Sequence, residues 1–528
     1  MSVLALAFVP ASLAAQPMNM PGMSMSARPA KPRNAKHAAI HSRSIAKKPP
    51  STRSKEIRQR ASAPKDGGAP KVQDGQSAGM PMAGPGASQA GPMPAAPSPT
   101  PSAPMGMTMP AQSGEILSGE MATPSGNKGM AGMAMGKGDH AMESHGAYGP
   151  YSRQRESSGT AWQPDASALM GGPMLMSGEW MLMAHGTVNF VEDHQSGPRG
   201  NDKAFASGMM MGMATRPLGD GTLQLRAMFS PDPTMGPAGY PLLLATGETA
   251  NGRTPLVDRQ HPHDFVMELS ASISQDLGNN SSVFLYAGLP GEPAFGPPAF
   301  MHREAILDSP EAPITHHWFD STHISFGVIT AGLVIDRLKV EASRFNAREP
   351  DQRRWNIETG PLDSTSIRIS WNPGRTLAIE GSWGYFKDPE QLEPGVDQKR
   401  LSASVLWADE VAPGWHAATT LAWGRKTATL DHDDAVAAEA SLKHAQWTLF
   451  GRAEMTSNRE LLGLGKRTPA YRVGKLSLGT VRDFKVADHL SFGVGGLFAV
   501  NFVPDALALL YGGHNPLGAM GFVRLRVN

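Results

Sequence analysis

The stretch LSFGVGGLFAVNF, Leu490–Phe502, alternates between large apolar side chains and small or polar ones. The small and polar face is interrupted once, by Leu497. A period of two indicates a β-strand whose two faces meet different surroundings. The apolar face holds Leu490, Phe492, Val494, Phe498, Val500 and Phe502. Because the other face is small and polar, the pattern predicts a strand between an apolar medium and a wet interior.

Segments with this alternation follow one another from about residue 179 to the C-terminus, separated by Gly, Pro, Asn and Asp. Many are long enough to cross a bilayer at a tilt, and Trp and Tyr occur towards their ends. A soluble sandwich would instead fill its inner face with bulky apolar side chains. We therefore predict an all-β chain in which residues 170–528 form an antiparallel transmembrane β-barrel of about 14–16 strands. The expected strands are 179–191, 204–215, 222–229, 264–276, 282–288, 321–335, 337–347, 363–372, 377–385, 399–409, 415–424, a hairpin at 435–456, 471–484, 490–502 and 517–528.

Composition narrows the classes of function. The 48 basic and 47 acidic residues leave a net charge of +1, so no overall field attracts nucleic acid. The absence of cysteine excludes disulfides, thiolate metal sites and cysteine nucleophiles. The chain also has no nucleophile elbow, phosphate-binding loop or His-Glu-x-x-His motif. We expect neither an enzyme nor an organic cofactor.

The N-terminal third differs from the rest of the chain. Residues 1–15, MSVLALAFVPASLAA, form an apolar run that ends in small residues, which predicts a cleaved secretion signal. Residues 16–165 are dominated by Met, Pro, Gly, Ala and Ser. Such a segment cannot bury enough apolar surface to offset its ordering entropy, so we expect a long disordered extension.

Methionine is concentrated in this extension. Sixteen of the 31 methionines lie in the first 150 residues, spaced mostly two or three residues apart. Thioether sulfur prefers Cu(I) or Ag(I), and imidazole also suits Cu(II). The alternative is an inert linker in which methionine is merely tolerated. The candidate copper ligands are Met18, Met20, Met23, Met25, Met105, Met107, Met109, Met130, Met133, Met135, His140, Met142 and His145.

The middle of the barrel holds a second group of candidates. Six of the 17 histidines fall between residues 258 and 323, where loops near 230–260 and 289–320 are long enough to enter the lumen. The alternation predicts that Ile324, Phe326 and Val328 face lipid, as do Phe265, Met267 and Leu269. The candidate ligands are His261, His263, Asp264, His302, His316, His317 and His323.

Three roles for this second group remain open. The side chains suit a Cu(II) or Zn(II) transit site or a pH-responsive gate. They also suit a hydrogen-bonded network with Arg259 and Arg303 that ties loops to the wall.

A family resemblance rests on the extension. The segments NMPGMSM (19–25) and GMAGMAMGKGDHAMESHG (129–146), together with a secretion signal and a C-terminal barrel, resemble the copper-resistance protein B group. The resemblance implies periplasmic copper sequestration, or copper passage across the outer membrane, within a resistance system.

The sequence thus predicts an outer-membrane barrel that handles copper ions as cargo. Its extension would lie in the periplasm and capture Cu(I) and Cu(II). Expected partners are outer-membrane lipid and periplasmic copper proteins, without nucleic acid. We expect a monomer, because closure removes free sheet edges, with a trimer as the alternative. The competing hypothesis is a general porin-like solute channel with a passive linker as its tail.

Overall fold

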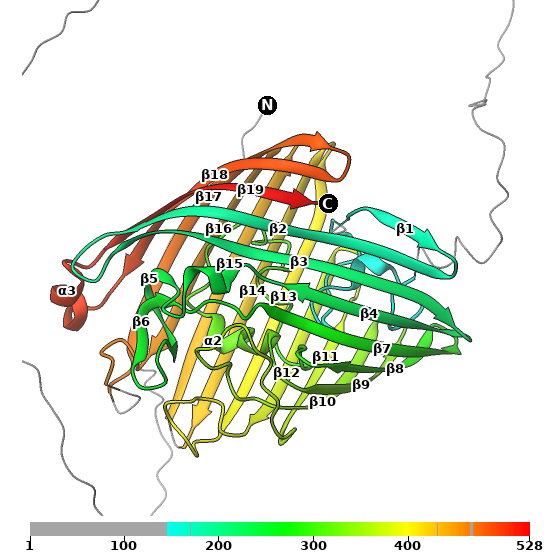
Figure 1. Ribbon diagram of the computed structural model, residues 1–528, viewed down its shortest axis with the longest axis horizontal. Coiled ribbons are helices and arrows are strands. Elements are labelled where there is room, and N and C mark those ends of the chain that lie inside the picture. The colour runs from blue at the N-terminus through cyan, green and yellow to red at the C-terminus, as the bar shows by residue number, and fades with distance from the viewer. Residues whose placement is uncertain (1–144, 169–170, 430, 465–467) are drawn as a thin grey trace, which may run out of the picture. The chain divides into compact units, whose positions relative to one another are not determined.

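The computed structural model describes residues 145–528 apart from 169–170, 430 and 465–467. Its main sheet of 17 strands consists of sixteen antiparallel barrel strands and the short β1 (Figure 1). Pairing of β19 with β2 closes the barrel. The barrel strands are β2 (Trp180–Gln195), β3 (Asp202–Leu218), β4 (Gly221–Phe229), β7 (Val266–Gly278), β8 (Ser281–Gly288), β9 (Val328–Ile335), β10 (Leu338–Phe345), β11 (Ser364–Trp371), β12 (Leu377–Phe386), β13 (Gln398–Ala412), β14 (Trp415–Ala428), β15 (Asp431–His444), β16 (Trp447–Asn458), β17 (Tyr471–Ala487), β18 (Leu490–Phe502) and β19 (Leu517–Val527). The predicted antiparallel barrel is confirmed.

Several shorter elements complete the fold. β1 (Met174–Ser177) forms a hairpin with the start of β2, beyond the point where β19 ends. β5 (Tyr240–Thr249) and β6 (Pro255–Gln260) pair in a separate two-stranded sheet. The helical turns are η1 (Arg153–Arg155), η2 (Asp232–Met235), α2 (His316–Phe319), η3 (Ser321–His323) and α3 (Asp505–Tyr511). Among the described residues, no helix is both long and apolar enough to span a membrane.

The outer surface of the barrel is apolar, as the alternation predicts. On β18, Val494 and Phe498 are exposed, whereas Leu497 and Asn501 are buried. On β14, Leu421 is 60% exposed at the middle of the strand. A soluble protein would not expose such a face on every strand, so the barrel is of the outer-membrane type.

The two rims of the barrel differ. One rim carries tight turns, including residues 279–280, 413–414, 445–446 and 488–489. Exposed Trp371, Trp415 and Trp447 lie at strand ends next to this rim, as an interfacial girdle requires. The opposite rim carries the long connections, including those between β4 and β7 and between β8 and β9. In barrels of this type the short turns face the periplasm.

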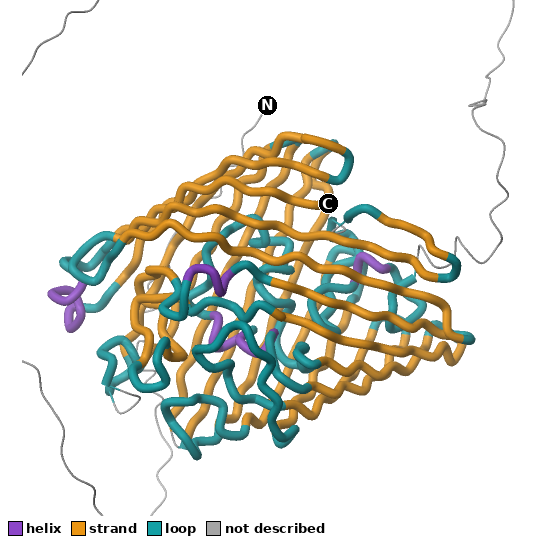
Figure 2. Tube along the Cα trace, in the orientation of Figure 1, coloured by secondary structure: helices purple, strands orange, loops and turns teal. Residues whose placement is uncertain are grey.

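Both long connections enter the lumen, as predicted, and Figure 2 shows loops and helices inside the strand wall. The inner wall carries acidic and basic side chains, and the loops supply their partners. Glu311 of the β8–β9 loop contacts Lys475 and Arg452, and Asp308 accepts a 2.8 Å hydrogen bond from Arg524. Because an unpaired buried charge costs several kcal/mol, these pairs determine where the loop lies.

A third segment, residues 145–168, also packs inside the barrel, although the predicted disordered extension included most of it. The segment begins near the tight-turn rim, where the Tyr148 carbonyl accepts a 2.6 Å hydrogen bond from Ser282. Deeper in the lumen, Arg226 donates to the Gly159 carbonyl at 2.7 Å, and Glu380 accepts from the Trp162 N–H at 3.1 Å. Wall charges thus hold this segment through its backbone.

Four residues predicted to face lipid are buried instead. β9 begins at Val328 rather than near residue 321, and Ile324, Phe326 and Val328 are buried instead of facing lipid. Ile324 and Phe326 pack in the lumen against methionines of the inner wall. Met267 is also buried, beside an irregularity in the β4–β7 pairing, whereas its neighbours Phe265 and Leu269 are exposed as predicted. An apolar loop that packs inward has the same alternation as a lipid-facing strand.

We predict that Leu421→Arg lowers the free energy of unfolding by about 2–4 kcal/mol, because it places a charge at the middle of the lipid-facing surface. Leu277→Arg, beside the turn at 279–280, should cost only about 0–1 kcal/mol. Denaturant titration in lipid vesicles measures both variants. Equal losses would contradict the assignment of Leu421 to the bilayer interior.

Candidate metal centre in the barrel lumen

The β8–β9 loop is fixed by one buried ionic network. Arg303 donates to Asp320 at 2.7 Å and to both carboxylate oxygens of Glu439 on β15, at 2.7 and 2.8 Å. Asp320 also accepts from the Phe300 N–H at 2.9 Å. The Arg303 guanidinium holds the pKa of Asp320 below its ordinary value despite burial. The carboxylate is therefore ionised and anchors the residues around it.

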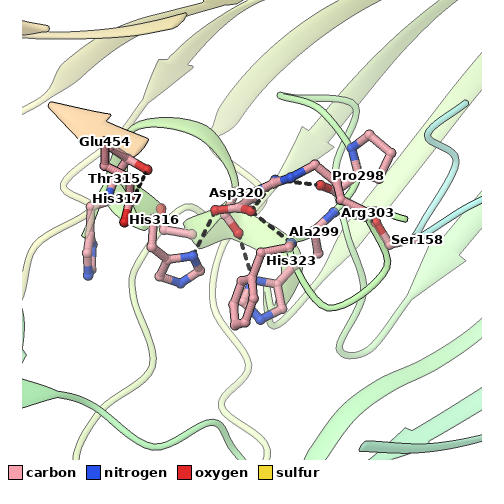
Figure 3. A network of polar contacts seen from close by, with 12 residues as sticks. Ser158, Pro298, Ala299, Arg303, Thr315, His316, His317, Asp320, His323 and Glu454 are labelled. Atoms are coloured by element: carbon pink, nitrogen blue, oxygen red, sulfur yellow. Dashed lines mark hydrogen bonds and ion pairs between the residues drawn. The ribbon is translucent and has the colours of Figure 1, made fainter. Parts of the chain in front are cut away.

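Two histidines are oriented by Asp320. In Figure 3 the rings of His316 and His323 lie on either side of this residue. His316 Nδ1 is 2.8 Å from the Asp320 carboxylate, and His323 Nδ1 is 2.6 Å from its backbone carbonyl. The short α2 and η3 turns on either side of Asp320 bring the two rings to a centroid separation of 5.2 Å.

Three more histidines complete a cluster around them. His261 lies 5.8 Å from His316 and 5.5 Å from His317, and His317 lies 5.4 Å from His316, all between ring centroids. His263 lies 5.1 Å from His323. We call His261, His263, His316, His317 and His323 the histidine cluster; its members come from the β6–β7 connection and the β8–β9 loop.

Each ring of the histidine cluster has an acceptor on its Nδ1 side. Besides the two contacts to Asp320, His263 Nδ1 is 2.8 Å from Asp232 and His317 Nδ1 is 3.2 Å from Glu349. His261 Nδ1 is 3.3 Å from Glu248. A carboxylate or carbonyl on one ring nitrogen leaves the other as the free ligand, which is how metal-binding histidines are usually oriented.

On the Nε2 side, four of the five rings of the histidine cluster are unsatisfied. Buried Nε2 atoms without a hydrogen-bond partner occur in His261, His263, His317 and His323. Within the described parts of the chain, however, no three His, Asp or Glu side chains already stand as a group able to hold a metal ion. The rings are thus gathered and oriented, and closing around an ion would require them to rotate.

Burial favours the neutral form of four rings, those of His261, His316, His317 and His323. Desolvation lowers the pKa values of His261, His316 and His323, and lowers that of His317 from 6.5 to about 4. Neutral imidazole is the form that binds metal ions.

Two of the predicted barrel ligands are not in the histidine cluster. Asp264 lies 3.3 Å from Arg354, and its burial raises its pKa to about 7. His302 packs instead near His185, with ring centroids 6.4 Å apart. Arg303 does tie a loop to the wall, as the network hypothesis expects, whereas Arg259 donates within its own loop region, to the Ala238 carbonyl.

Three residues beside the candidate ligands were not predicted from the sequence. Sequence reasoning missed His185, Asp232 and Glu248; inward alternation on β2 was the available signal for His185. In the extension, His145 is exposed and bridges Ser152. The other candidates there, from Met18 to Met142, lie outside the described residues.

A cavity of about 740 Å³ leads to the histidine cluster. Its lining begins at the tight-turn rim, with residues 445–446, 487–491 and 526–528, and reaches His261, His263 and Asp232. Small solutes therefore have space to approach the histidine cluster from the rim assigned to the periplasm.

Comparisons with known proteins give only distant structural similarity. No family model and no curated protein matches the chain. OmpT of Vibrio cholerae is 9% identical with a TM-score of 0.39, over 67% of this chain and 100% of that one. Salmonella typhi OmpF in complex with daunomycin is 10% identical with a TM-score of 0.44, over 67% and 100% of the two chains. The anion-selective porin from Comamonas acidovorans is 11% identical with a TM-score of 0.38, over 66% and 100%.

We predict that the histidine cluster loosens as the pH falls from 7 to 4. Burial lowers the folded-state pKa values of His316, His317 and His323, so these side chains bind more protons in the unfolded loop, and stability decreases as the pH decreases. The shift of His317 alone, from 6.5 to about 4, corresponds to about 3 kcal/mol at the acid end. Amide hydrogen exchange of residues 314–323, corrected for intrinsic rates, should accelerate, and His317→Gln should reduce the pH dependence. A pH-independent corrected rate would contradict the prediction.

Proposed function

We propose that this chain is a porin-like outer-membrane protein that binds copper ions in its lumen and acts in copper resistance. The observation that carries the proposal is the histidine cluster, in which every Nδ1 has an oxygen nearby and four Nε2 atoms have no partner. A structural hydrogen-bond network would pair both nitrogens, because an unpaired buried polar atom costs about 1–3 kcal/mol.

The spacing of three rings supports a shared ion. With metal–nitrogen bonds of about 2.0 Å, imidazole centroids around one tetrahedral or trigonal ion lie about 5 Å apart. His261, His316 and His317 form a triangle with sides of 5.8, 5.5 and 5.4 Å. We propose that rotation of these three rings directs their Nε2 atoms at one point. Imidazole ligands suit Cu(II), and copper is the most strongly bound of the divalent first-row ions.

The direction of access supports a periplasmic source of metal. The cavity opens at the tight-turn rim, and the described chain begins at the same rim, where Tyr148 contacts Ser282. We propose that the extension lies in the periplasm and that its methionines and histidines capture copper near this opening. Copper is then cargo that passes between the extension and the lumen. The resemblance to copper-resistance protein B points to the same role.

A general solute channel is the second candidate. The polar inner wall and the cavity favour it. Unlike the copper hypothesis, it requires a conducting pore whose conductance does not depend on metal ions. Bilayer conductance that copper leaves unchanged, in a protein that binds no copper in the lumen, would support this alternative.

We predict that the full chain with His261→Gln and His316→Gln binds one Cu(II) ion fewer than the unsubstituted protein. Electron paramagnetic resonance during a Cu(II) titration should show the loss of one species with several nitrogen ligands. His194→Gln is the matched control, because His194 is an exposed barrel histidine outside the cluster. Unchanged stoichiometry in a folded double variant would refute copper binding at the histidine cluster.

The role of the extension requires a separate test. Deleting residues 16–144 spares the segment inside the barrel, and we expect cells that carry this variant to tolerate less copper. Replacing the methionines of the extension by leucine keeps its length but removes its sulfur ligands, so tolerance should fall similarly. Growth on copper at graded concentrations measures both. Full tolerance with the leucine variant would show that the extension acts only as a linker.

A further inference from the structure

Methionine is unevenly distributed within the barrel as well. Of the fifteen methionines after residue 150, thirteen lie at or before Met301, and only Met455 and Met520 follow. If methionine served only to fill irregular space between the wall and the loops, it would be needed all round the barrel. The clustering therefore calls for a local explanation.

The fold gathers part of this group on the inner faces of neighbouring strands. Met211 of β3 pairs across the sheet with His185 of β2 on one side and with Met228 of β4 on the other. Met209 lies two residues from Met211 on the same buried face. The methionine wall consists of Met209, Met211, Met228 and Met267, with Met301 of the β8–β9 loop packed against them.

Two buried imidazoles accompany the methionine wall. His185 is 5% exposed, and neither of its ring nitrogens has a hydrogen-bond partner. His302 is 4% exposed, and its Nε2 also lacks a partner. Their ring centroids are 6.4 Å apart. Apolar packing explains buried methionines, but it does not explain a histidine that loses its hydrogen bonds to water and gains none in return.

The two arginines near His185 already have partners. Arg226, next to the methionine wall on β4, lies 2.7 Å from Glu268. Arg153 is directed at the sulfur atoms of Met181 and Met183, at 3.5 and 3.3 Å, so these two sulfurs are occupied. What remains is a set of thioethers and unpaired imidazoles, which are soft and borderline ligands. Such a set prefers Cu(I) or Ag(I) to harder divalent ions.

We propose that His185 and His302, with the sulfur atoms of Met209, Met211 and Met301, form a second metal site that takes Cu(I) or Ag(I). His185, Met209 and Met301 line the cavity that also reaches His261 and His263, so an ion entering from the tight-turn rim meets this site. The site extends the proposed function by adding selectivity for the reduced ion. It does not require the histidine cluster to bind metal.

The test uses Ag(I), which does not change oxidation state, and the full chain labelled with ¹³C at the methionine methyl groups. We expect Ag(I) to shift the methyl signals of Met209, Met211 and Met301, which single Met→Leu variants assign. His185→Gln should abolish these shifts and leave those of the extension unchanged. Met520 is the internal control, because it is a buried methionine of β19 in another part of the core.

Two further variants keep the test decisive. His302→Gln replaces a loop residue and serves if His185→Gln fails to fold. The His261→Gln, His316→Gln protein should keep the Ag(I) shifts, so a failure of the histidine cluster is distinguished from a failure of this site. Ag(I) shifts confined to the extension would overturn the proposal. So would equal shifts of the methionine wall in the unsubstituted protein and in both the His185→Gln and His302→Gln variants.

Discussion

Compensation of buried charge between the inner wall and the lumen segments is the constraint on which the rest of the structure depends. Arg303 lies between Asp320 and Glu439, and Glu311 lies between Lys475 and Arg452. Buried ion pairs of this kind add little net stability, because desolvation offsets their attraction. Breaking one is costly, however, so they specify a single position for each loop. The barrel therefore acts as a rigid frame with charged contact points.

The positions of the metal-binding candidates follow from these contact points. Asp320 is held by Arg303 and in turn orients His316 and His323, so the ionic network and the histidine cluster are one connected structure. The interpretations considered for the sequence, a network that ties loops to the wall and a metal site, are thus compatible. The first holds the backbone of the ligand residues in place, so that only the rings must rotate on binding, and a preorganised backbone loses less entropy.

The sequence predicted the strands well and the lumen poorly, for a physical reason. A strand between lipid and water must alternate along its whole length, so the period of two in segments such as Leu490–Phe502 was readable directly. Ile324 and Phe326 alternate too, but they pack against inner-wall methionines, and local sequence does not distinguish this surface from lipid.

Contacts between segments far apart in the chain could not be predicted from the local sequence pattern either. The grouping of His302 with the other histidines followed chain proximity, whereas its loop directs it to His185, more than a hundred residues earlier. Backbone contacts such as that of Trp162 with Glu380 have no sequence pattern at all.

The path of residues 145–168 has a consequence for how the molecule is assembled. The segment contacts Ser282 near one tight turn and returns to the β11–β12 turn of the same rim, where the Ala166 N–H donates to the Arg375 carbonyl. It therefore enters and leaves through one opening and is not threaded through the barrel. A segment with this topology can dock after the last strand has paired, and it can be withdrawn without breaking any strand pairing of the closed barrel. The topology therefore does not require the wall and its interior to form at the same time.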